Sequence, residues 1–139
     1  MTALSAVELE EFAAAYTAAW CSQDASSVAA FFGANAAFQI NQDAPAVGTK
    51  AITAEAQAFM TGFPDMVVAM DSLKVVGGEV FWYWTMTGTN SGPGGTGNAV
   101  RFSGYEVWKL GADGLIADCR GHFDEAEYAR QLREGIAKV

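Results

Sequence analysis

The chain has 139 residues, of which 51% are hydrophobic and 17% are charged, and its formal net charge is −8. This length predicts a single domain, residues 1–139, that is large enough to bury a hydrophobic core. An acidic chain with few lysines and arginines is not expected to bind the phosphates of nucleic acids or anionic membrane surfaces.

Location and metal binding can be judged from the same sequence. The first residues, MTALSAVELEEF, contain no basic segment followed by an apolar one, and no later stretch reaches the roughly 18 apolar residues of a membrane-spanning helix. Cys21 and Cys119 fall in an expected helix and an expected strand, which favours reduced thiols in a cytoplasmic protein. With one histidine and no closely spaced cysteine pair, we expect neither a metal nor another cofactor.

Apolar residues at helical spacing predict three helices in the first half of the chain. The first begins after Ser5 and carries Tyr16 and Trp20 on its apolar side. Both aromatic side chains suit a core, and their polar atoms also suit the wall of a cavity. Two further helices, the first of them behind a capping aspartate, are expected over about 25–32 and about 49–61.

The remaining segments alternate between apolar and polar residues, which is the spacing of strands. Strands are expected at 37–41, 66–76, 79–90, 99–110 and 115–123. Glycine-rich turns separate the last four, and a short helix follows Asp124. Helices followed by a meander of strands predict an α+β fold, in which the N-terminal helices pack against one face of a curved antiparallel sheet.

Four segments then carry a resemblance to a known family. They are AYTAAWCSQD at 15–24, GTKAITAEAQAFMTGFPD at 48–65, WTMTGTNSG at 84–92 and the closing segment 116–132. In this order and spacing they resemble the SnoaL-like polyketide cyclase branch of the nuclear transport factor 2-like superfamily. The resemblance implies a cone of curved sheet wrapped on helices, an apolar pocket inside the cone, and often a homodimer.

The closing strand holds the candidate catalytic residues. The resemblance implies that Asp118 and Arg120 point into the pocket, and His122 shares their parity along the strand. The family's usual glutamate and tryptophan are Asp118 and Arg120 here, which makes the pocket more polar. Epoxide hydrolases similar to limonene epoxide hydrolase use an Asp-Arg-Asp arrangement, but its last aspartate falls at Gly121, which argues against that chemistry.

A hairpin register that pairs Leu110 with Ile116 would gather these residues into one cluster. Glu106 would then face Arg120, and Trp108 would face Asp118, at about 5 Å between Cβ atoms. The cluster has two interpretations. It is either a buried ion pair of Glu106 and Arg120 beside an inert His122, or a catalytic site.

In the catalytic interpretation, His122 is the general acid/base, because its ordinary pKa of about 6.5 suits proton transfer near neutrality. Asp118 or Glu106 orients it, and Arg120 stabilises an enolate or a carboxylate. Asp124 matches a family position that we associate with an acid/base aspartate, although it can equally cap the last helix. The expected substrate-binding residues are Arg120, Glu106, Trp20, Tyr16, Trp108, Phe102 and Tyr83.

Together these observations predict a small cofactor-free enzyme that performs cyclisation, isomerisation or hydration on an apolar, carbonyl-bearing small molecule. A non-catalytic binding protein or a structural homodimer of the same fold is the alternative, because fold alone does not decide function. A homodimer is expected in either case if Trp82 or Trp84 faces outward, since that would expose an apolar patch.

Overall fold

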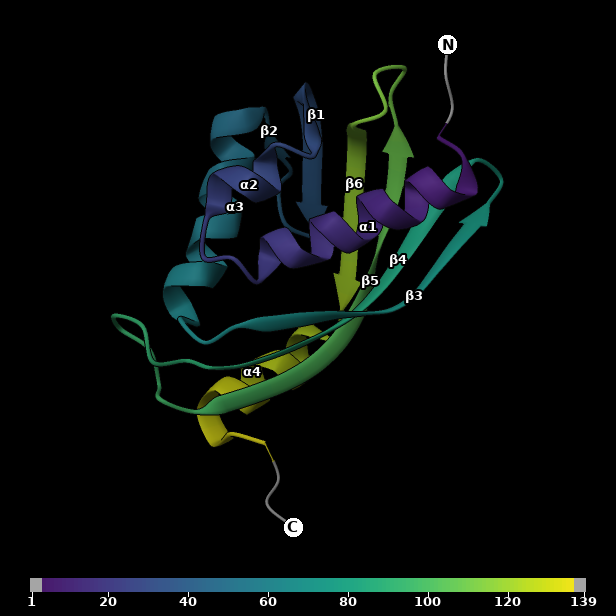
Figure 1. Ribbon diagram of the computed structural model, residues 1–139. Coiled ribbons are helices and arrows are strands. Elements are labelled where there is room, and N and C mark those ends of the chain that lie inside the picture. Colours follow the sequence, from purple (N-terminus) through teal and green to yellow (C-terminus); the bar gives the residue numbers. More distant parts are fainter. Residues whose placement is uncertain (1–3, 137–139) are drawn as a thin grey trace.

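The computed structural model describes residues 4–136. Four helices and six strands follow one another along the chain, and Figure 1 shows their arrangement. They are α1 (Ala6–Trp20), α2 (Ala25–Ala29), β1 (Phe32–Ile40), β2 (Ala46–Val47), α3 (Thr49–Gly62), β3 (Val67–Val76), β4 (Glu79–Thr89), β5 (Ala99–Leu110), β6 (Ile116–Phe123) and α4 (Glu125–Glu134). The expected α+β class is confirmed.

All six strands form one curved sheet in the order β2-β1-β6-β5-β4-β3. Neighbouring strands are antiparallel, as expected, except β1 and β6, which run parallel. The expected helix over 25–32 is too long, because α2 ends at Ala29 and Phe32 already pairs with Ile116. The two phenylalanines at 31–32 continue an apolar helical pattern, but pairing with β6 overrides it.

The helices cover one face of the sheet, here called the inner face. Figure 1 shows α1 lying across the sheet, with α2 and α3 stacked beside β1. A capping box starts α1, in which Ser5 Oγ accepts from the Glu8 N–H and the Glu8 carboxylate accepts from the Ser5 N–H. Along β4, Trp82 and Trp84 are buried and therefore face inward. The outward placement that favoured a dimer is wrong for both tryptophans.

The last helix completes the sheet at the end of the cone away from α1 (Figure 1). Strand β6 stops at Phe123, which leaves the edge of β5 without a neighbouring strand. The buried amide of Gln131 on α4 takes its place, accepting from the Arg101 N–H at 2.7 Å and donating to the Arg101 carbonyl at 2.9 Å. Tyr128 packs on Phe102 with ring centroids 4.6 Å apart. These contacts fix α4 against the rim of the inner face.

Within residues 4–136, none of the helices combines the length and the apolar character needed to cross a bilayer.

Candidate active site

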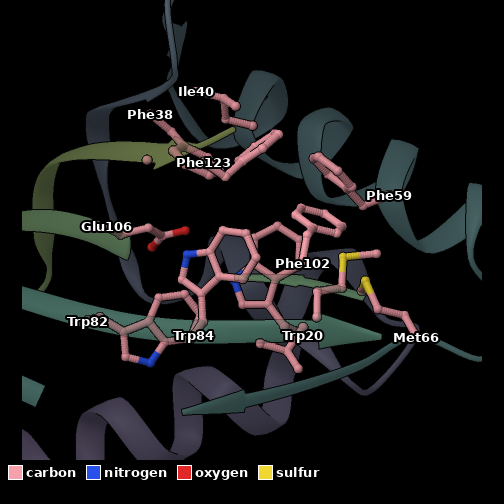
Figure 2. A pocket seen from close by; sticks show the side chains of 13 residues that line it. Trp20, Phe38, Ile40, Phe59, Met66, Trp82, Trp84, Phe102, Glu106 and Phe123 are labelled. Carbon is pink, nitrogen blue, oxygen red and sulfur yellow. The ribbon is translucent and has the colours of Figure 1, made fainter. Parts of the chain in front are cut away.

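A cavity lies between the inner face of the sheet and helices α1 and α3. About 490 Å³ of it is not filled by protein atoms, part of this space is open to solvent, and about 50 Å³ can take the centre of a water molecule. The wall consists of Trp20, Phe38, Ile40, Phe59, Met66, Val68, Trp82, Trp84, Met86, Phe102, Glu106, Gly121 and Phe123. Figure 2 shows that aromatic rings dominate this wall and that the carboxylate of Glu106 reaches into it.

The register of the β5–β6 hairpin decides which residues reach the cavity. Leu110 does pair with Ile116, but Lys109 then pairs with Asp118, so the ladder contains a bulge at Ala117. One extra residue moves every following side chain of β6 to the opposite face. Glu106 therefore lies opposite Gly121 rather than Arg120, and the expected cluster does not form.

Three of the predicted catalytic and binding residues consequently lie on the outer face. His122 packs on Tyr105 with ring centroids 4.9 Å apart, and Arg120 pairs with Asp118 at 3.3 Å in a surface ion pair. Tyr83, expected at the substrate, also lies outside and packs on Tyr105 at 5.5 Å. The prediction that Asp118, Arg120 and His122 line the pocket is wrong in placement, and the bulge is the reason.

Asp124 lies at the start of the last helix, as expected if it acts as a helix cap. Its carboxylate accepts from the Glu127 N–H at 3.0 Å and caps α4. Glu127 does not return the bond to Asp124, because it pairs with Arg130 at 2.7 Å instead.

The remaining predicted residues do meet at Glu106, which is buried on β5. Its Oε1 accepts three hydrogen bonds, from Tyr16 Oη at 2.8 Å, Trp108 Nε1 at 3.0 Å and Cys119 Sγ at 3.2 Å. These donors come from α1, β5 and β6, so three elements hold one oxygen in place. Within residues 4–136, no hydrogen bond reaches Oε2. Trp20 and Phe102 line the cavity beside it.

Burial sets the protonation of this group and of its donors. Loss of water raises the pKa of the Glu106 carboxyl, and the hydrogen bonds from Trp108, Tyr16 and Cys119 oppose that rise. Burial, together with the nearby Glu106 charge, raises the pKa of Tyr16 and of Cys119 well above their ordinary values. Both therefore remain protonated donors near neutral pH, and Glu106 is the ionisable side chain of the cavity wall.

Two tryptophans of the wall add hydrogen-bond donors that are not used. The indole N–H of Trp82 donates to Thr17 Oγ1 at 3.1 Å, but those of Trp20 and Trp84 are buried without an acceptor among the described residues. Sequence reasoning missed Trp84 and Cys119 at this site. The alternation along β4 contained a signal for Trp84, since it shares one parity with Trp82 and Met86 and all three are buried.

Residues 4–136 contain no group of three or more His, Cys, Asp or Glu side chains arranged to hold a metal ion.

Comparisons with known proteins agree with this architecture. The sequence model of the SnoaL-like polyketide cyclase family matches residues 10–132. No curated protein matches the sequence.

Solved structures match at low identity. AclR, a putative hydroxylase from Streptomyces galilaeus, is 19% identical with a TM-score of 0.78, and the match covers 97% of this chain and 86% of that one. A putative SnoaL-like polyketide cyclase from Jannaschia sp. CCS1 is 16% identical with a TM-score of 0.74, covering 98% and 100%. A hypothetical protein with a ketosteroid isomerase-like fold from Catenulispora acidiphila, solved with trimethylamine, is 14% identical with a TM-score of 0.76, covering 88% and 92%. These likenesses establish the fold.

Proposed function

This chain belongs to the family of SnoaL-like polyketide cyclases, and on that premise we propose that it is an acid/base enzyme whose proton-transferring group is Glu106. The observation that carries the proposal is one buried carboxyl in an apolar, aromatic cavity. A general acid/base works best when its pKa lies near the working pH, and burial moves the Glu106 pKa upward, in that direction.

The hydrogen bonds divide the two carboxylate oxygens between two tasks. Three donors fix Oε1, so the carboxylate cannot rotate freely, and Oε2 is left for the substrate. In the proposed reaction, Oε2 takes the proton from a carbon next to a carbonyl, the C–H pair becomes the C=C bond of an enolate, and the carbonyl π pair moves to oxygen. Protonated Glu106 then returns the proton to another carbon, which isomerises the substrate or follows ring closure.

The wall of the cavity indicates the class of substrate. Its aromatic and aliphatic side chains favour an apolar molecule, and no lysine, arginine or histidine is among the wall residues to neutralise an anion. A neutral, carbonyl-bearing molecule therefore fits better than a carboxylate or a phosphate.

The proposal can be tested by deuterium exchange into aromatic ketones such as 1-indanone, followed by proton NMR in D2O. We expect Glu106→Gln to slow exchange next to the carbonyl by about 10²- to 10⁴-fold. His122→Ala, which changes the outer face, should exchange at the wild-type rate. Equal rates for the wild type and Glu106→Gln would contradict the proposal, and a loss confined to His122→Ala would favour the earlier assignment of His122.

A non-catalytic binding function is the second candidate, and the aromatic rings beside Glu106 favour one ligand for it. Tryptophan faces and a carboxylate together attract organic ammonium ions, and the Catenulispora relative was solved with trimethylamine. Calorimetric binding of trimethylammonium that is lost in Glu106→Gln, without ketone exchange in the wild type, would support this candidate.

We also propose that the protein forms a homodimer through the outer face. Phe81 and Tyr83 of β4 pack on Tyr105 of β5 there, with ring centroids 6.2 and 5.5 Å apart. Light scattering coupled to size-exclusion chromatography should give twice the chain mass, and Tyr105→Lys should give the monomer. A wild-type protein that elutes as a monomer at all concentrations would contradict this proposal.

A further inference from the structure

Two tryptophans of the cavity wall, Trp20 and Trp84, have indole N–H groups that could donate a hydrogen bond to a ligand. The chain has four tryptophans. Two of them have partners, since Trp82 donates to Thr17 and Trp108 donates to Glu106. Within residues 4–136, the N–H groups of Trp20 and Trp84 have no hydrogen-bond partner, and both residues line the cavity. A buried donor without a partner costs about 1–3 kcal/mol, so a group that arrives with the ligand is the natural partner.

Trp84 is the better placed of the two donors. Figure 2 shows its indole in the cavity on the same side as the Glu106 carboxylate. The ring is held by Phe102 and Phe123, at centroid distances of 5.5 and 6.0 Å. Gly104 makes room for it, because a Cβ at that position would lie 2.7 Å from Trp84 Cζ2. The donor is thus fixed in direction before a ligand binds, which lowers the entropy cost of using it.

Trp20 is less available. Its ring meets that of Tyr16 edge to face at 6.4 Å, and an interaction with Trp20 opposes the rise that burial causes in the Tyr16 pKa. In the described part of the chain, no comparable interaction engages the buried N–H of Trp84, so we expect it to respond more strongly to a ligand.

On this basis, and resting on the function proposed for Glu106, we propose that Trp84 Nε1 is the positioning donor that binds the carbonyl oxygen of the substrate. The ligand is then a neutral molecule with an apolar body and at least one acceptor oxygen. A carbonyl held on Trp84 keeps its hydrogen bond while the proton moves to Glu106, so the same N–H stabilises the enolate oxygen that forms. A hydrocarbon of the same shape would leave Trp84 unpaired and bind more weakly.

The four indole N–H signals in a ¹⁵N–¹H NMR spectrum test this directly in the wild-type protein. The probes are 1-indanone and indane, which differ only by the carbonyl oxygen. We expect indanone, and not indane, to move the Trp84 N–H signal downfield, and to move that of Trp82 much less because Thr17 already accepts from it. Equal shifts of Trp84 and Trp82, equal shifts with both probes, or no shift with indanone at its solubility limit would overturn the proposal.

Trp84→Phe provides a second measurement, in which binding of both probes is followed by calorimetry. Loss of one hydrogen bond should weaken indanone binding about five- to tenfold and leave the change for indane below about twofold. Equal weakening of both probes would show that the ring only fills space and would overturn the proposal. A selective Trp84 response without ketone exchange would support this inference and contradict the acid/base role of Glu106, so the two failures are distinguishable.

Discussion

The two faces of the β5–β6 hairpin contrast sharply although they share one backbone. On the inner face, Glu106 is buried and accepts three hydrogen bonds from neighbouring elements. On the outer face, Arg120 and Asp118 form an ion pair whose side chains are 61% and 30% exposed. Water does not readily replace the hydrogen-bond donors of the buried Glu106 carboxylate, whereas it can replace either member of the exposed ion pair.

The difference teaches that burial, rather than the number of charged side chains, concentrates chemistry at one place. The outer face holds Asp118, Arg120 and the imidazole of His122, but Asp118 and Arg120 pair with each other and His122 packs on Tyr105. On the inner side, Glu106 is the ionisable side chain of the cavity wall, and loss of water raises its pKa. A single extra residue at Ala117 decides which set reaches the cavity.

The largest effect is expected where the inner face has no room for a side chain. Gly104→Ala would bring a Cβ too close to the His122 carbonyl oxygen and to 2.7 Å from Trp84 Cζ2. Because a backbone atom is involved, the strand must shift, and we expect the free energy of unfolding to fall by about 2–3 kcal/mol. Urea denaturation measures this change.

Gly121→Ala is the matched control on the neighbouring strand. Its Cβ would lie 3.7 Å from both Glu106 Cγ and the Gln39 carbonyl oxygen, which is ordinary contact. We expect a change in stability below about 1 kcal/mol, with a smaller cavity. Similar losses for both variants would show that the inner face is not packed as tightly around Trp84 as described.

The next effect concerns the hydroxyl that holds Glu106. Tyr16→Phe removes the donor at 2.8 Å from Oε1 without changing the ring. Hydrogen bonds to charged groups contribute about 1.5–3 kcal/mol, so we expect a loss of about 2 kcal/mol near neutral pH and an upward shift of the Glu106 pKa. The control is Tyr83→Phe on the outer face, which should change stability by less than about 0.5 kcal/mol. Equal effects of the two substitutions would contradict the proposed difference between the faces.

The pH dependence of stability should separate the buried carboxyl from the exposed ones. Burial raises the folded-state pKa of Glu106 above its ordinary 4.5, so the folded state binds this proton more tightly than the unfolded state. Its stabilising contribution is complete below about pH 4.5 and disappears as the pH rises through the raised pKa. The stability of the wild type relative to Glu106→Gln should therefore fall with rising pH above 4.5. A difference that stays constant from pH 4 to 8 would refute this.

Glu127 provides an internal comparison of opposite sign. Its hydrogen bonds with Arg130 and Gln131 lower its pKa to about 2. The contribution of this exposed group is present above pH 4.5 and is lost as the pH falls through about 2. The two carboxyls therefore act in different pH windows, and Glu127→Gln should leave the dependence above pH 4.5 unchanged.

Most of the fold follows from patterns within the sequence. Ser5 and Glu8 have the spacing of a capping box and form one, and the alternation along β4 and β5 predicts both strands. The short β2 and the parallel pairing of β1 with β6 were not predicted, because two residues show no periodicity and a parallel pair joins segments far apart in the chain. The residue pattern within one segment does not show which distant segment it pairs with.

The site was harder to predict, for one physical reason. The side chains of a strand alternate between the two faces of the sheet. A bulge turns every side chain that follows it to the opposite face, and the alternating sequence pattern does not reveal this change. Glu106, Tyr16 and Trp20 were identified from residue type and spacing, and they do lie at or beside the cavity. The family resemblance placed Asp118 and Arg120 there, and His122 followed because it shares their parity, but the ladder shifts at Ala117 and turns all three to the outer face. No glycine or proline marks that shift within β6.

The smallest effect is expected on the outer face. Arg120→Ala removes a partner of Asp118 that lies 3.3 Å away, but the arginine side chain is 61% exposed and water replaces it. Exposed ion pairs contribute about 0–1 kcal/mol and are weakened by salt, so we expect a loss below about 0.5 kcal/mol that vanishes in 0.5 M NaCl. Thermal denaturation at low and high salt measures it. A loss above about 2 kcal/mol at both salt concentrations would mean that Arg120 is enclosed in the native protein and that the dimer interface proposed around Tyr105 extends over β6.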